Sequence, residues 1–316
     1  MTLTAPNADK VEQDQAGNAF QSAERSPGLL RESSWARWVR RPGLRRRWFR
    51  PNRLVLGLAF VFLLLMVAWA LFPSLFTSGS PSATDPLTTL RAPSGTFPLG
   101  SDQYGRSVYT ELVYGARTAL EIGFLCTLLG GGVGSAIGVL SGYIGGAIDM
   151  VVMRCVDVLM ALPPLFLALV FIAALAPTVT NEIIAVSVAT IPLFARVLRG
   201  RALEVRSRVF VDALTVVGVR KRRILWRHVI PNCAAPGMVL GSITIGTAIV
   251  TGASLNYLGL GPTGVTSWGT LISNGQGYIN KEWWIAIFPG VLITLLVLSV
   301  NVIADWLRDV MEPSSR

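Results

Sequence analysis

Stretches of mostly apolar residues alternate with polar segments along the chain, after a polar region that extends to Arg53. A helix needs about 20 such residues to cross the hydrocarbon core of a bilayer. The stretches that qualify lie near residues 54–73, 118–141, 150–176, 182–199, 234–258 and 284–305. Pro192 falls inside the fourth, where proline is tolerated if neighbouring groups satisfy the freed carbonyl. The pattern therefore predicts an all-α membrane protein with six transmembrane helices.

The polar segments between these stretches set the expected domain boundaries. We expect a disordered to amphipathic, basic segment over 1–53, a first transmembrane helix over 54–73, an extracytoplasmic segment over 74–117, a core with five further helices over 118–309, a loop inside that core over about 200–231, and a tail over 310–316.

Lys and Arg residues gather in two of these segments and orient the chain. The formal net charge is +10, and of the 28 basic residues eleven lie up to Arg53 and ten between Arg196 and Arg227. Loops rich in Lys and Arg stay on the cytoplasmic side of a membrane. Both termini and the loop over 200–231 are therefore predicted to be cytoplasmic.

Composition excludes several classes of protein. Hydrophobic residues make up 52% of the chain and charged residues 15%, against about 25% charged in a typical soluble domain. The single histidine and three separated cysteines match no metal-site spacing, and the Gly-x-x-x-x-Gly-Lys-Ser/Thr phosphate loop is absent. We expect neither a metal, a cofactor nor an ATPase site in this chain. The basic residues beside the first span favour membrane lipid over nucleic acid.

Small residues crowd the second span, and they are Gly130, Gly131, Gly132, Gly134, Ser135, Ala136 and Gly138. Such residues let helix backbones approach closely in lipid. The pattern leaves two interpretations open, which are tight helix packing and a helix that slides or lines a path.

Ionisable residues at membrane depth are costly, so each one needs an explanation. Arg154 and Asp157 are three residues apart in the third span, so they share a helix face and are predicted to form an intramembrane ion pair. Glu121 and Glu182 lie near outer ends of spans, where we expect them to be solvated or to line a path. No chain of Asp, Glu and His residues connects them, which argues against a proton-coupled carrier.

The segment Val205–Asn232 is too polar to span a membrane, yet it carries an apolar stripe. Phe210, Ala213, Leu214 and Val217 are spaced i, i+3, i+4, i+7, which predicts one apolar face on a short helix. Gly218 follows, and glycine commonly ends a helix. Such a face fits either a groove on a partner protein or an anionic lipid surface, and the residues alone leave both open.

The same segment carries a spaced signature. It reads Asp212-Ala213-Leu214, three residues, Gly218, nine residues, His228-Val229-Ile230-Pro231. This spacing resembles the EAA signature of bacterial ABC importer permeases, which reads Glu-Ala-Ala, three residues, Gly, nine residues, Ile, one residue, Leu-Pro. The sequence departs from it by Asp for Glu, Leu for Ala, and His and Ile at the later apolar positions.

Other segments resemble the C-type permease of dipeptide, oligopeptide and nickel importers, and the resemblance covers about residues 54–313. They are Phe97–Ser107, Tyr114–Arg117, Gly142–Gly146, Ser254–Gly261, Ser267–Gly269, Phe288–Gly290 and Asp305–Asp309.

The resemblance implies a passive transport subunit of the bacterial inner membrane. Its partners would be a second permease subunit in a heterodimer, two cytoplasmic ATPase subunits that bind ATP and Mg, and an extracytoplasmic substrate-binding protein. The implied ATPase-coupling residues are Phe210, Asp212, Ala213, Leu214, Gly218, Ile230 and Pro231.

The substrate would be a dipeptide or oligopeptide, with nickel or another small solute as the alternative. A secondary carrier is a more distant alternative, because it would need no coupling loop. A membrane scaffold or an intramembrane enzyme is disfavoured, since the spans offer no catalytic set.

Overall fold

The computed structural model describes residues 53–311, with side chains up to Val310. The segment predicted before Arg53 and the end of the predicted tail lie outside the described residues. The helices in order are α3 (Arg53–Leu71), α4 (Pro73–Phe76), η1 (Pro86–Thr88), α5 (Val108–Ile144), α6 (Gly146–Met160), α7 (Pro164–Ala173), α8 (Val179–Arg206), α9 (Val209–Val216), α10 (Lys221–Ile224), η2 (Leu225–Val229, a π-helix), α11 (Ile230–Tyr257), α12 (Trp268–Gly275), η3 (Gln276–Tyr278) and α13 (Trp284–Met311). Over residues 53–311 no strand forms apart from an isolated bridge between Ser101 and Ser107, which confirms the predicted all-α class.

Five of the described helical stretches are long and apolar enough to cross a membrane. They are α3, α5, α8, α13 and the continuous run from α10 through α11. The helices α6 and α7 pass the same test only together, and they bend by 88° at the break between them. The described chain therefore holds six spans if this bent pair counts as one.

The stretch predicted as a third span over 150–176 is thus not a continuous helix. It contains Leu162-Pro163-Pro164, and neither proline has an N–H to continue a helical ladder. A proline also disfavours the helical conformation in the residue before it. Pro163 accordingly adopts an extended backbone with φ −56° and ψ 142°, and α7 starts at the next residue.

The helix α5 begins at Val108, ten residues before the predicted start of the second span, and Ser107 caps it by accepting from the Thr110 N–H. It packs most extensively against α8. Glycines on one face of α5 meet the α8 backbone directly. A Cβ atom on Gly134 would lie 2.5 Å from the Ile191 carbonyl oxygen, and one on Gly138 would overlap the Ala195 carbonyl. The predicted small-residue pattern therefore serves close packing between α5 and α8.

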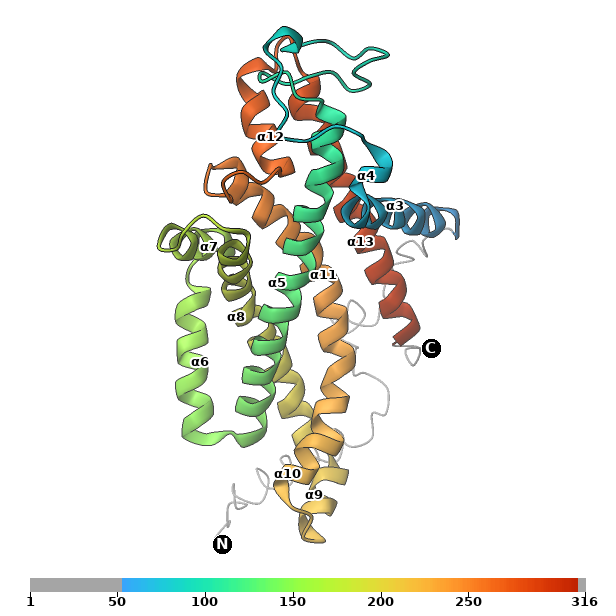
Figure 1. Ribbon diagram of the computed structural model, residues 1–316. Coiled ribbons are helices and arrows are strands. Elements are labelled where there is room, and N and C mark those ends of the chain that lie inside the picture. The colour runs from blue at the N-terminus through green and yellow to red at the C-terminus, as the bar shows by residue number, and fades with distance from the viewer. Residues whose placement is uncertain (1–52, 312–316) are drawn as a thin grey trace, which may run out of the picture. The chain divides into compact units, whose positions relative to one another are not determined.

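Three clusters of buried side chains hold the described helices together. One joins α3, α5, α12 and α13 around Met66, Leu112, Trp268 and Leu296. A second joins α5, α7, α8 and α11. The third lies at the end that carries α9 and α10, opposite the end that carries α12 (Figure 1).

The segment before α5 is folded against the α12 end of the bundle by specific contacts. The Trp284 indole Nε1 donates to the Ser101 carbonyl at 3.2 Å. Gly105 has φ +76°, and a Cβ there would overlap the Asp85 carbonyl, so only glycine fits. The motif over Phe97–Ser107 is thus explained by a tight turn that brings Arg106 to the first turn of α5.

Candidate functional site

Two features of the described chain are candidates for function, one at each end of the bundle. The first is formed by α9, α10 and η2, and we call these three elements together the α9 surface. The second is a polar cavity between α5 and the α11–α12 loop, which we call the outer cavity because the predicted orientation places it outside.

Glycine ends α9 as the sequence predicts. Gly218 has φ +85°, its N–H donates to the Thr215 carbonyl at 3.0 Å, and the Val219 N–H donates to the Leu214 carbonyl at 3.0 Å. This pair of hydrogen bonds is a Schellman motif, which satisfies carbonyls at the end of a helix. It turns the chain sharply from α9 into α10.

One side of α9 anchors it to the bundle. Val211 is buried, and Leu214 and Val219 pack against the same cluster, which includes Phe194 of α8 and Ile224 of α10. The Tyr143 hydroxyl of α5 donates to the Lys221 carbonyl at 2.9 Å, which ties α5 to α10. The α9–α10 segment is therefore in direct contact with α8 and α5.

The other side of α9 is apolar and faces away from the bundle. Val209 is 83% exposed, Val216 87% and Val217 81%, and Phe210 is also exposed. Of the predicted stripe, only Leu214 is turned partly inward, whereas Phe210, Ala213 and Val217 lie outside. Exposed apolar residues gathered on one short helix indicate an interaction surface.

Basic and acidic groups surround this apolar face. Lys221, Arg222 and Arg223 are exposed on α10, and Asp212 is exposed on α9. Among the described residues no hydrogen bond or ion pair engages the Asp212 carboxylate, so it is open to a partner. Ile230 and Pro231 lie where α11 continues directly from the π-helix η2, and the Ile230 N–H donates to the Leu225 carbonyl there.

His228 belongs to this surface, although the sequence singled it out only within the signature and suggested no ligand or catalytic role. Its ring lies 6.1 Å from the Phe210 ring, centroid to centroid. It sits on the π-helix η2, and the extra residue per turn of such a helix redirects side chains locally. No sequence pattern predicts a π-helix, so the contact between His228 and Phe210 could not be predicted.

Two ion pairs join α6 to α8. Asp157 of α6 pairs with Arg196 of α8, not with Arg154 as predicted. Asp149 accepts from Arg199 Nε and Nη2, both at 2.6 Å. The i, i+3 spacing permits a pair within α6, but α8 brings a guanidinium to the same carboxylate.

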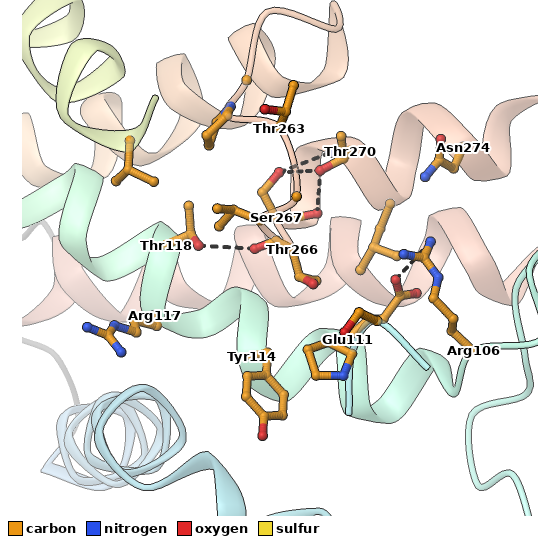
Figure 2. A pocket seen from close by; sticks show the side chains of 18 of the residues that line it. Arg106, Glu111, Tyr114, Arg117, Thr118, Thr263, Thr266, Ser267, Thr270 and Asn274 are labelled. Atoms are coloured by element: carbon orange, nitrogen blue, oxygen red, sulfur yellow. Dashed lines mark hydrogen bonds and ion pairs between the residues drawn. The ribbon is translucent and has the colours of Figure 1, made fainter. Parts of the chain in front are cut away.

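The outer cavity has a volume of about 760 Å³. One wall is α5, and the other is the loop from Gly259 to Ser267 with the start of α12. Figure 2 shows the Thr118 hydroxyl donating to the Thr266 carbonyl, at 3.0 Å, where the walls meet. The residues of α5 that line the cavity are Glu111, Tyr114, Arg117, Thr118 and Glu121.

Charged side chains stand at both ends of the α5 wall. Arg106 donates to Asp102 Oδ2 at 2.6 Å and lies 3.0 Å from Glu111 Oε1. Arg117 pairs with Glu121 at 2.8 Å. Glu121 lines the outer cavity and is 36% exposed. Glu182 is wholly buried instead of solvated, and its Oε1 accepts from Asn256 Nδ2 at 2.9 Å.

Comparison with known proteins decides the family. Residues 134–316 match the family described as binding-protein-dependent transport system inner membrane component. The chain belongs to that family. This inner membrane component is thus a multi-pass permease subunit of a binding-protein-dependent transport system, as the resemblance of its motifs implied.

Relatives extend the similarity over most of the permease. It is 35% identical to the dipeptide transport system permease protein DppC of Alkalihalophilus pseudofirmus, over 84% of this chain and 88% of the relative. It is 33% identical to the di/tripeptide transport system permease protein DppC of Pseudomonas aeruginosa, over 84% and 89%. It is also 33% identical to the glutathione transport system permease protein GsiD of Pectobacterium atrosepticum, over 85% and 89%.

A solved structure shares the fold of the permease. A chain of the MetNI methionine ABC transporter, in inward facing conformations, superposes with a TM-score of 0.54 at 19% identity. The match covers 64% of this chain and 96% of that one. At this identity the likeness shows the fold alone.

Proposed function

We propose that this permease is a transmembrane subunit of an ATP-driven importer of short peptides. It forms half of the translocation path and receives its driving force through the α9 surface. The observation that carries the proposal is the apolar, outward-facing side of α9, on a helix whose other side is locked into the core.

The proposed complex holds a second permease subunit, two cytoplasmic ATPase subunits and an extracytoplasmic binding protein. ATP and Mg are bound by the ATPase subunits, because this chain has no phosphate-binding loop. The α9 surface fits the helix-in-groove mode of recognition, with Phe210, Ala213 and Val217 as apolar anchors. Its exposed basic residues and Asp212 add electrostatic specificity around them.

Energy transfer follows from how α9 is anchored. When the ATPase subunits close, a groove that grips the outer side of α9 moves the helix. The buried contacts of Val211 and the hydrogen bond from Tyr143 carry the displacement into α8 and α5. Because packed helices move as bodies rather than deform continuously, the result is alternating access.

The substrate class rests on the relatives, whose names specify dipeptide, di/tripeptide and glutathione transport. Nickel or another small solute remains the alternative within the same family, and a secondary carrier lies outside it. Deletion of this importer should abolish uptake of labelled di- and trialanine. It should leave nickel uptake unchanged.

A substitution on α9 tests the coupling directly. Ala213→Asp places a charge in the apolar face, so an ATPase groove must desolvate it. We expect ATPase subunits to dissociate during purification and uptake of labelled trialanine to fall more than tenfold. Gly200→Ala, on α8 where no atom lies near the added Cβ, is the matched control. Retention of the ATPase subunits and of uptake in the Ala213→Asp variant would contradict the proposal.

A further inference from the structure

The outer cavity is sized and charged for a small zwitterion. Its volume of about 760 Å³ lies within the roughly 300–1,000 Å³ typical of small-molecule sites. Acidic and basic residues of one helix line it, and Figure 2 shows Glu111 and Arg117 on either side of Tyr114 along α5. A pocket built only to pass ions of one sign would carry one sign of charge.

The Glu111 end is rigid and has an unused acceptor. The side chain is 1% exposed and is held through Oε1 by Arg106, which Asp102 fixes in turn. Its other oxygen, Oε2, is buried and has no hydrogen-bond partner. Arg106 thus contacts both Asp102 and Glu111 and leaves only Glu111 Oε2 unpartnered at this end of the cavity. An ammonium group would supply the missing donor.

At the other end of the cavity, Arg117 can exchange its ion-pair partner. The Arg117 side chain is 69% exposed and Glu121 36% exposed. Exposed i, i+4 pairs contribute little to stability, so an incoming carboxylate can replace Glu121 as the partner of the guanidinium. Arginine binds carboxylates through two parallel hydrogen bonds, which adds geometric selectivity.

The two positions are separated along α5 by a length comparable with that of a short peptide. Glu111 and Arg117 are six residues apart, a rise of about 9 Å along the helix axis. An extended peptide spans at most about 3.3–3.6 Å per residue, so two to three residues cover this rise.

We infer that the outer cavity is a binding site for the free termini of di- and tripeptides, with the ammonium group at Glu111 and the carboxylate at Arg117. The inference rests on the proposed function, because it requires that peptides enter the path. It adds a second selection step within the membrane subunit, after the binding protein has released its cargo.

The test uses the complete importer in proteoliposomes, with trialanine and trialanine amide as probes. Arg117→Gln should lower trialanine transport at saturating binding protein about tenfold, the equivalent of roughly 1.4 kcal/mol. It should not change transport of the amide, which lacks the carboxylate, nor ATP hydrolysis stimulated by the binding protein. Arg117→Lys should keep most of the trialanine transport, because it keeps the charge.

Two variants separate ligand binding from a structural role of the ion pair. The double variant Arg117→Glu/Glu121→Arg keeps the i, i+4 pair in its more favourable order, so restored trialanine transport would overturn the inference. Arg91→Gln removes a positive charge outside the cavity, where Arg91 contacts the Leu87 carbonyl, and should have no effect. An equal loss for both probes in Arg117→Gln would also overturn it. If the wild-type importer transports neither di- nor trialanine, the result contradicts the proposed function itself and not only the inference about the cavity.

Discussion

Gly138 shows how a single hydrogen atom in place of a side chain sets the distance between two membrane helices. A Cβ at this position would overlap the Ala195 carbonyl oxygen of α8, which is backbone and cannot rotate away. On the same helix, Gly132 has no atom within 4 Å of the place where a Cβ would stand. The two glycines therefore differ in role although they belong to one run of the sequence.

This difference gives a prediction at the residue scale. Gly138→Ala should destabilise the protein by about 1–3 kcal/mol because α5 and α8 must separate. Gly132→Ala should be neutral or stabilising by up to about 1 kcal/mol, since alanine is the better helix former. Thermal unfolding of each variant in detergent measures the difference. Equal melting temperatures for the two variants would contradict the packing interpretation.

Residue-scale chemistry was only partly accessible from the sequence. The spacing of Phe210, Ala213 and Leu214 predicted the apolar face of α9, because helical periodicity is local. The Asp157–Arg196 pair and the cluster of Asp102, Arg106 and Glu111 could not be predicted from spacing. The pair depends on α8 facing α6, and the cluster depends on the tight turn that brings Arg106 to the first turn of α5.

At the scale of elements, α9 depends on its C-terminal turn. Gly218 has φ +85° and open space around it, so a substitution there meets backbone strain but no clash. The left-handed conformation costs a residue with a Cβ about 1–2 kcal/mol, and asparagine tolerates it better than alanine.

We therefore expect Gly218→Ala to loosen the turn between α9 and α10, and Gly218→Asn to loosen it less. Limited trypsin digestion, with the fragments identified by mass, should show faster cleavage at Arg220–Arg223 in the alanine variant. Gly200→Ala serves as a control, because Gly200 lies inside α8 with no positive φ. Unchanged cleavage in Gly218→Ala would show that the turn does not depend on glycine.

The elements themselves were predicted well where hydropathy and length decide them, as in α3 and α13. The break between α6 and α7 was missed because a hydropathy window averages across Pro163 and Pro164. The start of α5 was placed ten residues late because Glu111 and Arg117 stand among the apolar residues of its first turns and lower their mean hydropathy.

At the scale of the whole molecule, the orientation in the membrane is a prediction from charge. Ten basic residues between Arg196 and Arg227 favour a cytoplasmic α9 surface. Leu87 at the opposite end is 83% exposed, and Val216 on α9 is 87% exposed. These two positions report on the two sides of the membrane.

Single cysteines at these positions, in a Cys155→Ser background, test the orientation. Cys126 and Cys233 are buried and can stay. A membrane-impermeant maleimide should label Leu87→Cys in intact spheroplasts and Val216→Cys only after permeabilisation. The reverse pattern would invert the predicted topology and remove the α9 surface from the ATPase side.

The glycine contacts between α5 and α8 have a mechanical meaning. Helices whose backbones meet directly at glycines cannot slip past one another by a residue without a clash, so the pair moves as one rigid body. The helix α5 has 37 residues, which makes the rigid body about 55 Å long. A tilt of about 5° imposed at the α9 end would move the far end by roughly 5 Å, enough to change the width of a pore there. The length of α5 would then set the displacement at the far end, and the ATPase would need only to supply a small rotation at the α9 end.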